Sequence, residues 1–199
     1  MRILSVTALL FGVVLMATTA APTDEPQIQE LYRRGLKGDA AAVVQCIDKL
    51  EAVLQTEPGN QLARVYLGSA FTLRSRDLSF GPRKLQTLKR GVALMDEAVA
   101  AAPDNANVRL ARALTTQALP SFLGRAESTR RDFTALAETA QRAPEKFEPG
   151  DRQIIYYYAG LAAKRAGERD HAATLWQLAL RSPADPALTA RTEAELAKL

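Results

Sequence analysis

The sequence predicts an all-α protein of about four antiparallel helical hairpins followed by a C-terminal capping helix. Its composition is the first reason: Ala, Leu, Arg and Glu, which favour helices, are abundant, whereas aromatic residues make up only 6% of the chain. The second reason is the regular recurrence of proline with Gly, Asp or Asn, at residues 57–60, 102–105, 143–144 and 182–185. Each group ends an amphipathic segment, because proline cannot continue a helix and Asn or Asp can cap the next one.

Residues 1–20 are a predicted signal peptide, and residues 21–199 are the predicted helical repeat domain. Arg2 supplies a positive charge, residues 3–16 form an apolar run, and small residues follow at 17–21. The run is shorter than the roughly 20 apolar residues that span a bilayer. Cleavage is expected after Ala20, with an uncleaved N-terminal anchor as the alternative. The expected location is periplasmic or secreted.

Charge and cysteine content restrict the partners and the chemistry. Without Arg2, 25 basic residues face 22 acidic ones, an excess too small to demand a polyanionic partner, and no nucleic acid is expected. Cys46 is the single cysteine, so no intramolecular disulfide can form. Its neighbours Val43, Val44, Ile47 and Leu50 place it on the apolar face of a helix, where a thiol acts as a small hydrophobe. A reactive or intermolecular thiol is the alternative.

The first two hairpins are predicted from turn residues and small residues. The first turns at Lys37-Gly38-Asp39 and ends at Pro58. The second has Leu67-Gly68-x2-Phe71 in its first helix. Gly91, Met95 and Ala98 follow in its second helix, before Pro103. The connection between these two helices is long, basic and turn-forming.

The third hairpin is less regular than the second. Arg109 and Arg112 occupy positions of its first helix that are usually apolar, and its second helix is expected from about Glu127 to Arg142. Between them, residues 119–125 place apolar residues on both sides of a proline. This stretch either tucks under the array as core or forms an exposed docking loop.

The fourth hairpin and the cap complete the array. Gly160 and Ala172 are small enough for two helices to cross closely, and Trp176 is large enough to fill the space between neighbouring hairpins. Residues 156–158 are three consecutive tyrosines that point in three directions, so at least one is expected to face solvent. Residues 186–199 fit a capping helix that closes the array.

These patterns resemble the tetratricopeptide repeat (TPR), which pairs two helices with small, aromatic and proline residues at set positions. The resemblance covers most of residues 21–199, with the fourth unit matching best. The connection in the second unit is about eleven residues longer than the family's, and Cys46 falls on a small-residue position of the first unit. The resemblance implies a right-handed superhelical stack with a concave face that docks peptides or extended segments.

The resemblance also places specific residues on that concave face. We refer to the following eight as the predicted groove residues: Leu62, Val65, Ser69, Leu110, Leu114, Tyr157, Leu161 and Lys164. The alternative is that several of them pack against a neighbouring hairpin or an inserted loop. The basic residues Arg74, Arg76, Arg83 and Lys84 of the second unit could meet an acidic partner or anionic lipid. Their alternative is an ordinary solvated face.

No catalytic or metal-binding pattern is recognisable. His171 is the only histidine, and no cysteine pair or second histidine has metal-ligand spacing. No cofactor is expected, and the protein is not expected to be an enzyme. The predicted function is an exported scaffold or adaptor that binds a peptide or protein partner in the cell envelope. The alternative is a small-ligand-binding or enzyme-accessory protein with a pocket on the concave face.

Overall fold

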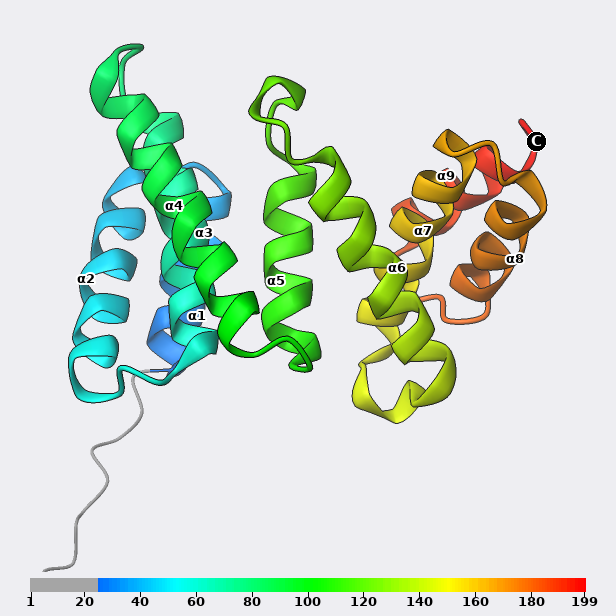
Figure 1. Cartoon of the computed structure of the whole chain (residues 1–199), viewed down its shortest axis with the longest axis horizontal. Helices are drawn as coiled ribbons and strands as arrows, with labels where there is room; N and C mark the ends of the chain where they lie inside the picture. Colours follow the sequence, from blue (N-terminus) through cyan, green and yellow to red (C-terminus); the bar gives the residue numbers. More distant parts are fainter. Residues whose placement is uncertain (1–24) are drawn as a thin grey trace, which may run out of the picture.

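The computed structural model describes residues 25–199, so the predicted signal peptide lies outside the described residues. Within this range the chain forms nine α-helices, two short 3-10 turns and no strand (Figure 1). The helices are α1 Glu25–Leu36, α2 Ala40–Thr56, α3 Gln61–Asp77, α4 Pro82–Ala101, α5 Ala106–Gln117, α6 Ala126–Arg142, α7 Pro149–Arg165, α8 Arg169–Leu180 and α9 Pro186–Leu196. The 3-10 turns are η1 Ser121–Leu123 and η2 Pro144–Lys146.

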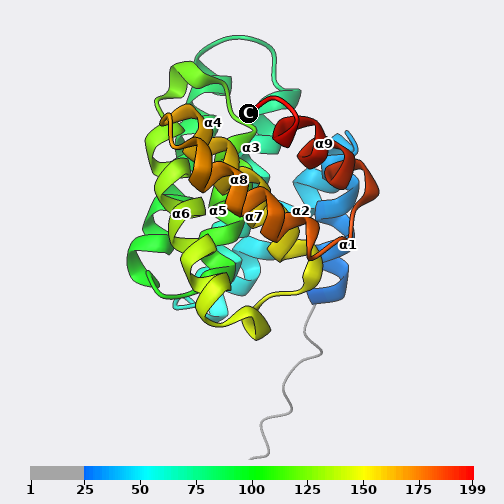
Figure 2. The ribbon, with the colours of Figure 1, turned by 90° about the vertical axis from the view of Figure 1, so that its right-hand side faces the viewer.

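The helices pair into four antiparallel hairpins, α1–α2, α3–α4, α5–α6 and α7–α8, which stack in chain order (Figure 1). Helix α9 packs on α8 and α7 and closes the C-terminal end. Seen along the stack, α1 and α9 lie toward the same side of the molecule (Figure 2). The predicted all-α fold of four hairpins and a cap is confirmed, whereas the right-handed superhelix stays a prediction.

Local capping explains where several helices begin. Three of the proline groups end in a capping residue: Asn60, Asn105 and Asp185. Each of these side chains accepts hydrogen bonding from the backbone N–H groups at the start of the following helix. Asp39 caps α2 in the same way. The group at 143–144 lacks Asn and Asp, and the chain instead forms turn η2 before Pro149 starts α7.

The hairpins cross most closely at glycines. A Cβ atom on Gly68 would lie 2.6 Å from the carbonyl oxygen of Gly91, and one on Gly91 would lie 2.5 Å from that of Gly68. A Cβ atom on Gly160 would lie 2.4 Å from Nε1 of Trp176. These distances confirm that the small residues recognised in the second and fourth units allow the helices to touch.

The long connection of the second unit is mostly helix. Only residues 78–81 link α3 to α4, and the additional residues lengthen these two helices. Arg74 and Arg76 therefore lie in the last turn of α3, while Arg83 and Lys84 lie in the first turn of α4. The α3–α4 hairpin consequently projects beyond its neighbours at the edge that is uppermost in Figure 1.

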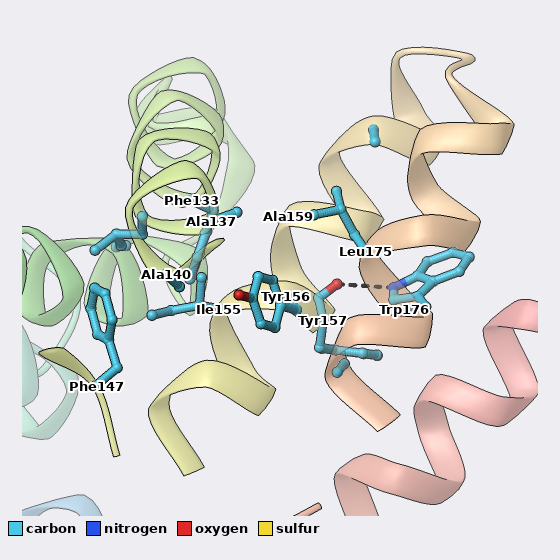
Figure 3. Packing of buried hydrophobic residues seen from close by; sticks show 14 of the residues in the cluster. Phe133, Ala137, Ala140, Phe147, Ile155, Tyr156, Tyr157, Ala159, Leu175 and Trp176 are labelled. Carbon is cyan, nitrogen blue, oxygen red and sulfur yellow. Dashed lines mark hydrogen bonds between the residues drawn. The ribbon is translucent and has the colours of Figure 1, made fainter. Parts of the chain in front are cut away.

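Buried apolar side chains form three clusters along the stack. The first joins α1, α2 and α3, the second joins α3, α4 and α5, and the largest joins α5 through α9. In the largest cluster Trp176 is fully buried, and its Nε1 donates a hydrogen bond to the carbonyl oxygen of Tyr157 at 3.1 Å (Figure 3). The indole N–H is thus satisfied inside the core.

The expectation that one of the three tyrosines faces solvent is wrong. Tyr156 and Tyr157 are 4% and 9% exposed, and Tyr158 is half-buried against Phe133, with ring centroids 5.0 Å apart. Helix α7 contacts α6, α8 and α9, so three of its sides are covered. A helix enclosed in this way is apolar around most of its circumference.

Candidate functional site

Half of the predicted groove residues are buried within the stack, and the other half are partly buried. Val65 and Ser69 on α3 are 0% and 2% exposed, and Leu110 on α5 is 6% exposed. Leu114 is partly buried against the largest core cluster. These four residues hold neighbouring hairpins together, and a role for them in contacting a partner stays a prediction.

Helix α9 covers the C-terminal part of the predicted groove. Lys164 donates a hydrogen bond from Nζ to Oε2 of Glu195 on α9 at 2.8 Å, and this ion pair is only partly exposed. Tyr157 is buried, and Leu161 packs against the same core cluster as Leu196. The cap therefore occupies the surface on which α7 was expected to meet a partner.

A chain of hydroxyl groups connects the first three hairpins at the predicted groove. The oxygen of Tyr32 on α1 lies 2.6 Å from Oγ of Ser69 on α3, which lies 2.8 Å from Oγ1 of Thr115 on α5. Burial raises the pKa of Tyr32, so its hydroxyl stays protonated and able to donate. Because buried polar groups need partners, Ser69 serves here as a link between hairpins.

Leu62 lies in a different environment, because it lines an open cleft at the N-terminal end of the stack. The cleft has a volume of about 570 Å³ and lies between the first half of α1, the second half of α2 and the first half of α3. We call it the N-terminal cleft. Its apolar lining includes Ile28, Leu50, Val53, Leu62 and Tyr66. Tyr66 is 36% exposed and meets Tyr32 edge to face, with ring centroids 5.3 Å apart.

Two carboxylates and one lysine line the N-terminal cleft. Glu25 and Glu57 are exposed residues of its lining, and Lys49 lies on the same wall. The pKa of Tyr66 is raised first by burial and then by the negative charges of Asp151 and Glu25. The cleft combines an apolar floor with two exposed carboxylates in its lining.

The two unusual arginines of the third unit have buried carboxylate partners. Asp132 on α6 is 1% exposed and accepts hydrogen bonds from Arg112 Nε at 2.8 Å, Arg112 Nη2 at 2.7 Å and Arg109 Nη1 at 3.0 Å. Arg112 also reaches Asp96 on α4 at 3.1 Å. This network joins the second and third hairpins, so Arg109 and Arg112 do not extend the basic surface of the second unit.

The four basic residues of the second unit differ in how they are used. Lys84 donates from Nζ to the backbone carbonyls of Arg76 and Leu78, at 3.2 and 3.0 Å. Arg76 bonds Asp77 and the carbonyl of Gly35. The side chains of Arg74 and Arg83 have no hydrogen bond or ion pair with any residue in the range 25–199. Two of the four thus brace the end of α3, and two are available to a partner.

The residues that could take part in catalysis or metal binding do not form a cluster. His171 is exposed on α8 and lies 3.2 Å from Glu168. Cys46 is buried, which raises the pKa of its thiol to about 11. Within residues 25–199, no three His, Cys, Asp or Glu side chains are grouped so as to hold a metal ion. In the same range, no helix is both long and apolar enough to span a membrane.

Sequence reasoning missed one positioning residue. Gln153 is fully buried in α7; its amide oxygen accepts from the backbone N–H groups of Ala184 and Asp185, and its nitrogen donates to Oγ1 of Thr189. These bonds fix the start of α9 and therefore the cover over the predicted groove. Nothing in the local pattern around a single glutamine predicts partners more than thirty residues away.

Comparison with known proteins agrees on the fold. No protein-family model matches the chain, and no curated protein sequence matches it. Among solved structures, the crystal structure of a thermophilic TPR protein of Thermus thermophilus is similar, with a TM-score of 0.60 and 19% sequence identity. The similarity covers 88% of this chain and 84% of that chain. The predicted TPR-like fold is confirmed, and at this identity the similarity concerns the fold alone.

Proposed function

We propose that this protein is an interaction scaffold whose N-terminal cleft binds a short peptide segment of a partner protein. The observation that carries the proposal is the cleft itself, which is open and apolar where the rest of the predicted groove is filled by hairpin contacts or by α9. A volume of about 570 Å³ is within the range of about 300–1,000 Å³ that is typical of binding pockets. Binding in such an array needs no catalytic group.

The surroundings of the cleft indicate which peptide fits. The apolar floor beside Leu62 and Tyr66 suits an aliphatic or aromatic anchor, and burying such anchors supplies most of the affinity in small interfaces. The exposed carboxylates of Glu25 and Glu57 favour a Lys or Arg beside the anchor. We therefore propose a peptide with an apolar anchor flanked by a basic residue.

A phage-displayed library of short random peptides, selected on the chain from Ala21 onward, tests this proposal. We expect enrichment of apolar–basic sequences, and a loss of affinity of about tenfold for the enriched peptide in Tyr66→Ala. Val44→Ala is the matched control, because Val44 is also 36% exposed but lies outside the cleft, and it should bind as wild type does.

Three results would decide against the peptide proposal. They are an unenriched library, a selected peptide that binds Tyr66→Ala as well as wild type, and binding of a small apolar molecule in the cleft without any peptide. The last result would favour the small-ligand alternative.

We also propose that the chain is exported, on the composition of residues 1–21, and that its partner lies in the periplasm or outside the cell. Expression of the full chain in a bacterium with an outer membrane, followed by fractionation and N-terminal sequencing, tests this proposal. The expected product is a periplasmic chain that begins at Ala21. A full-length chain in the cytoplasm would contradict it.

A further inference from the structure

Two aromatic side chains project from neighbouring hairpin tips at one edge of the molecule. Phe80, in the α3–α4 connection, is 101% exposed, and Phe122, in turn η1 between α5 and α6, is 80% exposed. Both connections protrude at the top of Figure 1 and again at the top of Figure 2, so the two views agree that they share one edge. Burying these two rings against an apolar phase would be favourable, because both expose most of their apolar area to water.

Both tips hold their phenylalanine outward by local bracing. At the first tip, Gly81 has a φ of 155° and Pro82 starts α4, while Lys84 bonds the two carbonyls at the end of α3. At the second tip, Pro120 precedes η1 and Gly124 follows it with a φ of 66°. Because proline and glycine set these turns, exposure of the rings does not depend on a long flexible loop.

The same edge carries the excess positive charge of the molecule. Four connections join the two helices of a hairpin. We define the tip edge as these four connections, each extended by four residues into the helix on either side. These segments are residues 33–43, 74–85, 114–129 and 162–172. They contain eleven Lys and Arg residues against five Asp and Glu residues.

The opposite edge has no such excess. Segments chosen in the same way around the connections between hairpins are residues 53–64, 98–109, 139–152 and 177–189, and they contain six basic and six acidic residues. Antiparallel hairpins place every within-hairpin connection at one edge and every between-hairpin connection at the other. The topology therefore separates a nearly neutral chain into a basic edge and a balanced one.

We propose that the tip edge docks on the surface of an anionic lipid bilayer, with Phe80 and Phe122 entering the headgroup layer and Arg74 and Arg83 facing lipid phosphates. Aromatic rings are favoured at the membrane–water interface, and basic side chains beside them gain from the negative surface potential. The rings stand on convex projections, which suit a planar surface. A soluble polyanion would satisfy the charges and leave both rings in water.

This proposal is independent of the peptide proposed for the N-terminal cleft. Peptide binding depends on Tyr66, whereas bilayer docking depends on residues at the tip edge. A variant in one surface therefore serves as a control for the other.

Vesicle co-sedimentation tests the proposal with the chain from Ala21 onward, which holds every helix and core cluster described above. The probes are vesicles of equimolar phosphatidylglycerol and phosphatidylcholine, and vesicles of phosphatidylcholine alone. We expect binding to the anionic vesicles only, and weaker binding at 1 M salt, where the screening length falls to about 3 Å. Phe80→Ser with Phe122→Ser should lower the partition coefficient about tenfold or more.

Charge variants give a second measurement. Arg74→Glu with Arg83→Glu should also weaken binding, by roughly fivefold or more for each charge removed. Arg142→Glu with Arg181→Glu is the matched control, since both arginines are exposed and belong to the balanced edge, and it should bind vesicles nearly as wild type does. Tyr66→Ala should keep vesicle binding and lose peptide binding.

Three outcomes would overturn the bilayer proposal. The first is no binding of the wild-type chain to anionic vesicles at low salt. The second is unchanged binding in the Phe80 and Phe122 double variant, which would reduce the interaction to non-specific charge attraction. The third is binding of polyglutamate that also depends on the two phenylalanines, which would indicate an acidic protein in place of lipid.

Discussion

The fourth hairpin depends on the absence of a side chain at Gly160, and Gly160→Ala tests this directly. The added Cβ would lie 2.4 Å from Nε1 and 2.6 Å from Cδ1 of Trp176, whereas ordinary contacts begin at 3.4 Å. The indole ring, which is fully buried, must therefore move by roughly 1 Å in a core that behaves as a close-packed solid. That movement also weakens its hydrogen bond to Tyr157.

The expected cost is the sum of opposing contributions. Overpacking costs about 1–3 kcal/mol, an unsatisfied indole N–H costs about 1–3 kcal/mol, and alanine in a helix gains about 1 kcal/mol over glycine. We expect the free energy of unfolding to fall by about 1–5 kcal/mol, which lowers the midpoint of thermal unfolding by about 2–20 °C in a chain of this size. Circular dichroism gives this midpoint, and the single tryptophan gives an independent fluorescence signal.

Gly150→Ala is the matched control, because Gly150 also lies in α7 and a Cβ there would be 3.7 Å from Ala184, an ordinary contact. It should leave stability unchanged or raise it by up to about 1 kcal/mol. In a Trp176→Leu background the cost of Gly160→Ala should shrink, giving a coupling energy of about 1 kcal/mol or more. A Gly160→Ala protein that unfolds within about 0.5 kcal/mol of wild type would refute the reasoning.

Three further predictions concern buried or paired charges and the buried thiol. Asp132→Asn should lower the free energy of unfolding by about 2–4 kcal/mol, because it removes the buried carboxylate that Arg109 and Arg112 share and leaves Arg112 only its contact with Asp96. Urea unfolding measures this change, and Glu127→Gln on the exposed face of α6 should change stability little. The pKa of the Cys46 thiol is raised from 9.0 to about 11, so it should react with a disulfide reagent at pH 8 at least roughly ninetyfold more slowly in the native than in the urea-unfolded chain. Equal rates would show that Cys46 is accessible. The pKa of Glu195 is lowered by its hydrogen bonds to Lys164 and Lys198, so its carboxylate stabilises the fold above its unfolded pKa of about 4.3, and that stabilisation is lost as the pH falls through the lower folded value. Glu195→Gln should accordingly be less stable than wild type at pH 7 and show a smaller difference below pH 4, as measured by thermal unfolding.

The local sequence determined most of the architecture. Proline groups, Asn and Asp caps, and small residues act over a few residues, so four hairpins and a cap were predictable, as were the small-residue positions of Gly91 and Gly160. The residues that these glycines contact, Gly68 and Trp176, became apparent only in the structure. Burial of Cys46 followed from the apolar face of its helix, although Val44, which was assigned to that face, is 36% exposed. Each of the predictable features depends on short-range patterns that recur in every helix of this kind.

Tertiary structure alone decided which surfaces are open. The predicted groove residues Val65, Ser69 and Leu110 are buried by neighbouring hairpins, and α9, held in place by Gln153, covers the groove at Lys164. The arginines of α5 proved to be partners of Asp132, twenty or more residues away. Exposure of Phe80 and Phe122 at one edge likewise depends on how whole hairpins stack. Whether a side chain faces water, a partner or the core depends on contacts between segments distant in sequence, and a local pattern carries no record of them.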